Sequence, residues 1–160
     1  MSIFEGGFNT LRSSAIVFRK VEDMANTMQV DIVSAEEEVF SGEATMLIVS
    51  AAAGDVGIAP GHAAFISPIK PGDIAIHTEG GEEQHIYVSG GVVEVQPHVV
   101  TVLADTAVRG GDLDESEAEE ARVRAEEQMK EAAGTPDYAA AAQQLAEASA
   151  RLSVLKKLRK

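Results

Sequence analysis

The stretch VTVLADTAVRGGDLDESEAEEARVRAEEQ, residues 100–128, changes from the pattern of a β-strand to that of a helix at Gly110-Gly111. Before these glycines, residues 29–108 show period-two alternation and short apolar runs, separated by turns that contain glycine or proline. Many short strands of this kind are typical of a β-sandwich or a barrel. After the glycines the apolar positions recur every three or four residues, which indicates helices.

The helical part is predicted to form two antiparallel helices. Asp112 or Asp114 can cap the first helix, and Gly134 predicts its end. Thr135 is then expected to cap the second helix, with Pro136 as its first residue. The apolar stripes of the two helices are predicted at Ala118, Ala121, Ala125, Met129 and Ala132, and at Tyr138, Leu145, Ala148, Leu152 and Leu155. Because alanine buries little area, we expect the two helices to cohere weakly.

Length and charge limit the classes of protein that the chain can represent. Its 160 residues are enough for one domain, or for one compact domain with an appendage, so a large multidomain enzyme is excluded. There are 26 acidic and 13 basic residues, a net charge of −13, which disfavours nucleic acid as a partner. The chain has no cysteine, which excludes disulfides, thiolate zinc sites and cysteine nucleophiles. No apolar run has the length of a membrane span.

A search for catalytic chemistry finds no convergent set of residues. The segment Gly54-Asp55-Val56-Gly57 is not a dinucleotide fingerprint, since no helix is predicted after it. Ser89 lacks the glycine two residues earlier that a hydrolase elbow needs, because Tyr87 occupies that position. The histidines, at positions 62, 77, 85 and 98, have no recognisable metal spacing. We therefore expect no catalytic residue, no cofactor and no metal site.

The charges of the helical part are segregated along the chain. Acidic residues crowd its beginning, whereas the last turns are basic and contain no acid after Glu147. The basic residues of this C-terminal tip, which we call the basic tip, are Arg151, Lys156, Lys157, Arg159 and Lys160. On an acidic protein such a cluster is suited to contact an acidic partner.

Six fragments of the chain resemble, in order and spacing, the epsilon subunits of bacterial proton-translocating ATP synthases. They are Val33-Ser34-Ala35-Glu36, Phe40-Ser41-Gly42, Gly57-Ile58-Ala59-Pro60-Gly61-His62-Ala63, Ile69-Lys70-Pro71-Gly72, Tyr87-Val88-Ser89-Gly90-Gly91-Val92-Val93-Glu94-Val95 and Val100-Thr101-Val102-Leu103-Ala104-Asp105-Thr106-Ala107. The resemblance runs from about Met28 to the C-terminus. It is weaker in the helices, where mainly Asp112-Leu113-Asp114-Glu115 and Asp137-Tyr138 match.

This resemblance implies a fold that agrees with the periodicity. It predicts an N-terminal flattened β-sandwich of about ten strands, followed by a C-terminal antiparallel two-helix hairpin. The expected domains are the β-sandwich at residues 28–109 and the helical hairpin at residues 110–160. Residues 1–27 are expected to be an N-terminal extension that is disordered or results from an upstream start assignment.

The resemblance also implies a function. Such subunits are non-catalytic parts of the central stalk, or rotor, and couple proton flow through the membrane ring to ATP synthesis in the catalytic head. Their sandwich binds the gamma subunit and the ring, and their helical hairpin can extend into the head of alpha and beta subunits and inhibit ATP hydrolysis. The implied location is peripheral, on the cytoplasmic face of the bacterial inner membrane.

Particular residues follow from the resemblance as expectations. Contact with the membrane ring is expected at residues 54–62, through Asp55, Ile58, Pro60 and His62. The basic tip is expected to contact the head. Some members of the family bind ATP through an arginine that corresponds to Glu117 here. A carboxylate at that position repels phosphate, so ATP binding by this chain is not expected.

Two other classes of protein remain open from the residues alone. A free-standing β-sandwich could bind a small ligand in the turns of residues 54–62. A small hydrolase could be built on Ser89 or the histidines. Neither class explains a pair of helices with a basic end.

Overall fold

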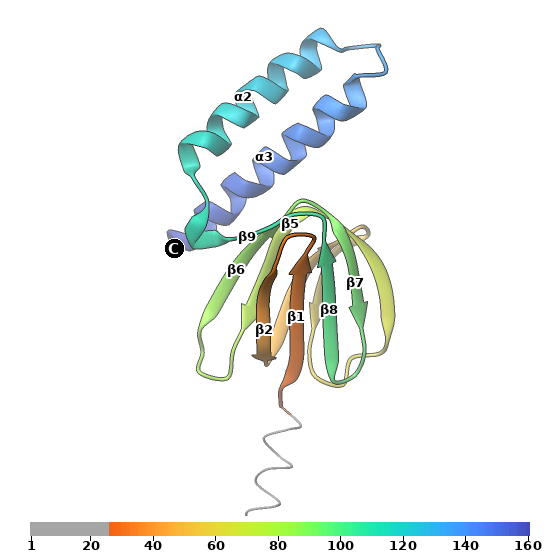
Figure 1. The fold of residues 1–160 in the computed structure, drawn as a ribbon, viewed down its shortest axis with the longest axis vertical. Helices are drawn as coiled ribbons and strands as arrows, with labels where there is room; N and C mark the ends of the chain where they lie inside the picture. Colours follow the sequence, from red (N-terminus) through yellow and green to blue (C-terminus); the bar gives the residue numbers. More distant parts are fainter. Residues whose placement is uncertain (1–25) are drawn as a thin grey trace, which may run out of the picture.

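The computed structural model describes residues 26–160, in which nine strands precede two long helices. The strands are β1 (Met28–Ser34), β2 (Glu38–Ala44), β3 (Met46–Ala51), β4 (Gly54–Ile58), β5 (Phe65–His77), β6 (Glu83–Val88), β7 (Gly91–Val95), β8 (Val99–Ala104) and β9 (Ala107–Arg109). A 3-10 turn, η1 (Gly110–Asp112), leads to α2 (Glu115–Glu131) and α3 (Tyr138–Leu158). Figure 1 shows the strands wrapped into one body, with both helices at one end of it.

This architecture confirms the predicted β-sandwich followed by a two-helix hairpin. The nine strands of the described residues compare with the expectation of about ten. The change from strand to helix falls at Gly110, where β9 gives way to η1. The expectation of an N-terminal extension falls almost entirely on residues 1–25, which lie outside the described residues.

The strands form a sheet that curls around one apolar core. Its order is β2-β1-β8-β7-β5-β3-β4, and β6 pairs with both β5 and β9. Neighbouring strands are antiparallel except β1 and β8, which are parallel. In β1, β7 and β8 alternate residues point into the core, so that Val30, Val93 and Val102 are fully buried, whereas residues 72–76 of β5 and 86–88 of β6 are buried without alternation. This inward alternation is the period-two pattern of the sequence.

Strand β5 joins the two halves of the sheet. Its residues 65–69 pair with β7, and its residues 72–77 pair with β6. Lys70 and Pro71 lie between these two ladders and pair with neither strand, a position where the missing N–H of proline is tolerated. A Cβ atom on Gly72 would lie 2.6 Å from the Cβ of Ser50. Glycine at this position therefore allows β3 to approach the bend of β5.

Of the two residues predicted to cap the first helix, Asp114 is the one that does so. Asp114 accepts a hydrogen bond from the backbone N–H of Glu117 at 3.0 Å, whereas Asp112 belongs to η1. Of the predicted stripe on α2, Ala118 and Ala125 are buried. A carboxylate cap of this kind satisfies one of the free N–H groups of the first helical turn.

The predicted start of the second helix is wrong by two residues. The hydroxyl of Thr135 donates to the carbonyl of Ala132 at 2.7 Å, so it serves the end of α2 instead of capping α3. Pro136 lies in the turn, and α3 begins at Tyr138. Tyr138 is exposed, while Val154, which was not predicted for the stripe, is fully buried.

Gly91 allows β7 and β8 to pair closely, and its replacement tests this arrangement. Its φ is +134°, and an added Cβ would lie 2.0 Å from the carbonyl oxygen of Leu103. We expect Gly91→Ala to destabilise the fold by about 3 kcal/mol or more, since positive φ alone costs roughly 1–3 kcal/mol. Chemical denaturation measures this change. The matched control is Gly57→Ala in β4, where no atom lies within 4 Å of the added Cβ; equal effects of the two substitutions would contradict the prediction.

Candidate functional site at the contact between the helices and the sandwich

The helical hairpin contacts the sandwich through α3. This helix packs on β5 and β6, and α2 packs mainly on α3 (Figure 1). The last turns of α3 come close to η1, where a Cβ on Gly110 would lie 2.8 Å from Cδ1 of Leu158 and 3.0 Å from the carbonyl oxygen of His85. Glycine at this linker therefore lets the end of α3 approach β6.

The centre of this contact is a buried carboxylate. The side chain of Asp73, on β5, is 6% exposed, and its Oδ2 lies 2.9 Å from Nζ of Lys157 on α3. Nδ1 of His85, on β6, lies 2.9 Å from the same oxygen and 3.1 Å from Oδ1. Nε2 of His85 lies 3.3 Å from a carboxylate oxygen of Glu83. We call Asp73, His85, Lys157 and Glu83 the Asp73 cluster.

The sheet register explains why these groups meet. Asp73 pairs with Tyr87, and Ala75 pairs with His85, so Asp73 and His85 are diagonal neighbours on adjacent strands. A carboxylate that is removed from water needs charged or hydrogen-bonding partners. Asp73 obtains one partner from its own sheet and a second from the helical hairpin.

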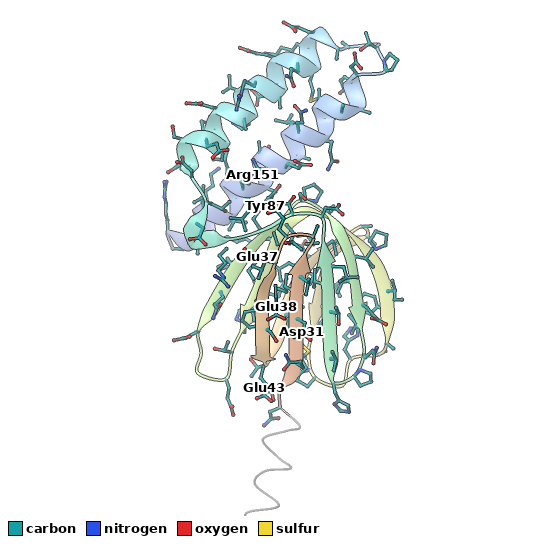
Figure 2. The ribbon with its side chains drawn as sticks, viewed as in Figure 1. Asp31, Glu37, Glu38, Glu43, Tyr87 and Arg151 are labelled. Carbon is teal, nitrogen blue, oxygen red and sulfur yellow. The ribbon has the colours of Figure 1, made fainter. Side chains whose placement is uncertain are left out.

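A second contact joins α3 to the sandwich at Tyr87. The guanidinium carbon of Arg151 lies 5.1 Å from the centre of the Tyr87 ring, as expected for a cation–π contact. Figure 2 shows Arg151 on α3 next to Tyr87 on the strand below it. The Tyr87 hydroxyl is buried and has no hydrogen-bond partner among the described residues. Burial raises the pKa of Tyr87, and the positive charge of Arg151 partly opposes this shift.

The basic tip is therefore divided in this structure. Arg151 contacts Tyr87, Lys157 binds Asp73, and Arg159 forms an ion pair with Glu115 at the start of α2. Lys156 and Lys160 are exposed, and neither forms an ion pair with another described residue. These partners could not be predicted from the sequence, because Asp73 and Glu115 lie 84 and 44 residues along the chain from Lys157 and Arg159. The one feature of the sequence that could have indicated a buried ion pair is Asp73 itself, a carboxylate directly before the apolar run at residues 74–76.

The four residues expected at the membrane ring do not form one surface. Ile58 is fully buried in the core, which corrects its assignment as a contact residue in this conformation. Asp55 is exposed next to the β3–β4 turn and accepts a hydrogen bond from Ser50. Pro60 and His62 lie beyond the opposite end of β4, beside the turn at residues 96–98, to which Gly61 donates a backbone hydrogen bond. His62 also stacks at an angle on Phe65.

Glu117 lies in a shallow hollow at the base of the two helices. Asp112, Asp114 and Arg151 line the same hollow. Arg124 lies in a neighbouring hollow between α2 and α3, which Arg151 also lines. The hollow at Glu117 thus has three carboxylates and one guanidinium around it. Within residues 26–160 no cluster of acidic and histidine side chains has the arrangement of a metal site.

The fold and this contact define a class of protein in which a helical hairpin is docked through one helix on a β-sandwich. The family model of the ATP synthase delta/epsilon chain matches in two parts: its beta-sandwich domain at residues 27–110, and its long alpha-helix domain at residues 112–156. The ATP synthase epsilon chains of Thioalkalivibrio sulfidiphilus and Halorhodospira halophila are each 54% identical to this chain. The alignments cover 86% and 84% of this chain, and 98% and 96% of those chains.

A solved structure shares the fold. A chain of the Euglena gracilis mitochondrial ATP synthase, in a structure of its OSCP, F1 and c-ring, superposes with a TM-score of 0.64 at 19% identity. The superposition covers 84% of this chain and 80% of that one. With the family models and the curated relatives, these findings show that the chain belongs to the ATP synthase delta/epsilon chain family, as the sequence motifs predicted.

Neither helix in the part that the structure describes has the length and apolar character to cross a bilayer.

The buried Tyr87 hydroxyl predicts a pH dependence of stability. As the pH rises above the ordinary tyrosine pKa of 10.0, this tyrosine ionises in the unfolded chain while the raised pKa keeps it neutral in the folded one. The free energy of unfolding should therefore fall more steeply between about pH 9 and about pH 11 in the unsubstituted protein than in Tyr87→Phe. Near neutral pH Tyr87→Phe should be at least as stable as the unsubstituted protein, by up to about 1–3 kcal/mol, since it removes a buried hydroxyl that makes no hydrogen bond. Parallel curves for the two proteins would contradict the prediction.

Proposed function

We propose that this chain is a non-catalytic central-stalk subunit of a bacterial rotary ATP synthase, and that it couples proton flow through a membrane ring to ATP synthesis. The observation that carries the proposal is identity of 54% with ATP synthase epsilon chains over nearly their whole length, sandwich and helices included. The proposed location is peripheral, at the cytoplasmic face of the inner membrane. This location suits a family member in which no described helix can span a bilayer.

The proposed partners differ for the two parts of the chain. The sandwich is proposed to bind the gamma subunit and the ring, and the basic tip to contact alpha and beta subunits when the helical hairpin leaves the sandwich. An acidic chain with net charge −13 that carries a cluster of cations at one end is electrostatically suited to such a contact. In the docked arrangement Lys156 and Lys160 already extend into solvent. We propose no nucleotide site, since three carboxylates surround the hollow at Glu117.

Affinity purification tests the assignment as a whole. Tagged chain expressed in its bacterial host and purified from solubilised membranes should bring a gamma subunit with it. Mock purification from untagged membranes is the control. A free-standing ligand-binding module would be recovered without rotor subunits, and a small hydrolase would show turnover in isolation, so either outcome would contradict the proposal.

Crosslinking tests which end of the sandwich faces the ring. Asp55 is exposed, and Ser50 holds its carboxylate, whereas the ring of His62 packs on Phe65 at the other end of β4. The resemblance implies ring contact for both residues, but because they lie at opposite ends of β4 we propose that one end faces the ring, and that it is the exposed end at Asp55. A cysteine at position 55 should then form a disulfide with a cysteine in the polar loop of the ring, and one at position 62 should not. The natural chain has no cysteine that could interfere. Crosslinking from position 62 and not from 55 would reverse the proposed orientation.

Truncation tests the proposed inhibition of ATP hydrolysis. Removal of all residues after Gly134 deletes α3 and the basic tip, and it should raise ATP hydrolysis by membranes several-fold while gamma still co-purifies. Neutralising the five basic residues together should have the same direction of effect, since each exposed pair contributes only about 0–1 kcal/mol and several must act together. Unchanged hydrolysis in both variants would show that the helical hairpin has no inhibitory role.

A further inference from the structure

Apolar burial gives the docked helical hairpin little hold on the sandwich. The residues that α2 and α3 bury are mostly alanines, namely Ala118, Ala125, Ala141 and Ala148, together with Val154. At the end of α3, Leu158 reaches Gly110 but is still 44% exposed. Each alanine removes only about a methyl group from water, and Leu145, Leu152 and Leu155 of α3 are only half-buried, so the apolar contacts of the hairpin are fewer than a leucine-rich stripe would make.

The polar part of the contact between α3 and the sandwich contains a buried charge. Asp73 is the one charged residue that residues 26–160 bury, and it lies directly beneath α3. Lys157 reaches it from the helical hairpin, and half of the Lys157 side chain remains in contact with solvent. An ion pair between a buried and a half-exposed group is stronger than a surface pair, yet it still weakens as salt is added.

When α3 undocks, the Asp73 carboxylate is not left without partners. When α3 leaves the sandwich the carboxylate loses Lys157, but it keeps His85 on the neighbouring strand and gains water on the uncovered side. The desolvation of Asp73 on docking thus opposes its attraction to Lys157. Opposing terms of this kind reduce the net contribution of the pair, but removing Lys157 alone leaves the full desolvation of Asp73 against docking and so shifts the populations.

The remaining contacts of the basic tip define which parts move together. Arg159 pairs with Glu115, so this ion pair ties the end of α3 to the start of α2 and does not cross to the sandwich. Arg151 contacts Tyr87 through the face of a ring, which carries no net charge. Lys157 is therefore the one residue of the basic tip that forms an ion pair across the contact among the described residues.

We propose that Asp73 and Lys157 form an ionic latch that holds the helical hairpin on the sandwich, and that loss of this pair, or high salt, undocks α3. The inference goes beyond the proposed function, because it names the interaction that sets the position of the helical hairpin. It concerns the isolated chain, so it stands or falls independently of any partner.

Distance measurement between two spin labels tests the latch. The labels are attached to cysteines introduced at Glu36, in the exposed β1–β2 turn, and at Ala133, in the exposed turn between the helices; the chain has no other cysteine. Undocked molecules should give a long, broad distance, and in Lys157→Gln the ratio of undocked to docked molecules should rise about tenfold, the size expected for loss of a hydrogen bond to a charged group. Lys156→Gln removes the neighbouring exposed lysine and should leave the distances unchanged.

Three further measurements make the result decisive. Raising the salt from about 50 mM to about 500 mM should undock the unsubstituted chain and have little effect on Lys157→Gln. Asp73→Asn should undock α3 less than Lys157→Gln, because it removes the buried charge together with the ion pair, and when added to Lys157→Gln it should restore docking in part. Gly110→Ala, which pushes against Leu158 and the backbone of His85, should undock α3 by sterics, while Gly111→Ala, with open space around its Cβ, should not. The glycine pair shows that the labels detect undocking.

The overturning results are equally specific. If Gly110→Ala changes the distances but Lys157→Gln matches Lys156→Gln at both salt concentrations, the latch does not exist. If both lysine variants undock α3 to the same extent, general charge and not the Asp73 pair holds the helix. Thermal unfolding of each variant identifies those in which the sandwich itself has been lost, and Lys157→Gln, a change at a half-exposed position, is expected to retain it.

Discussion

The bend of strand β5 is the constraint on which both parts of this molecule depend. Before the bend the strand pairs with β7, and after it the strand pairs with β6, so one segment closes the sheet around its core. The residues directly after the bend also present Asp73 to the helical hairpin. Because Gly72 permits the close approach of β3 and Pro71 needs no ladder partner, the shape of the sandwich and the position of α3 are both determined at this bend.

Features that depend on residues a few positions apart could be predicted from the sequence. The β5–β6 hairpin follows from alternation on both sides of a glycine turn, and its observed register pairs Ile74 with Ile86. One of the two predicted carboxylates, Asp114, caps α2. The paired glycines at positions 90 and 91 both have positive φ, a backbone conformation that favours glycine. In each case the physical cause is local: side-chain period, a cap, or the φ angle that a turn requires.

Features that depend on distant residues could not be predicted. Asp73 and Lys157 are neutralised by each other across 84 positions, and no local pattern encodes that contact. Ile58 resembles part of a surface turn because Gly57 and Pro60 flank it, yet it ends a strand and points into the core. Thr135 is a residue type that commonly caps the start of a helix, but here its hydroxyl donates to the carbonyl of Ala132 at the end of α2. Local propensity allows each of these alternatives, and tertiary packing selects among them.

Lys157 takes part in both states of the helical hairpin, the one docked on the sandwich and the one proposed to bind a partner. A lysine ammonium that donates to Asp73 at 2.9 Å cannot at the same time give that contact to another acidic surface. On the proposed function, binding of the basic tip to a partner and docking of α3 on the sandwich therefore compete for one charge. A partner shifts the hairpin only by the difference between its affinity for Lys157 and that of Asp73. An alanine-rich hairpin suits this arrangement, because weak apolar packing leaves the ionic terms large enough to decide which state is populated.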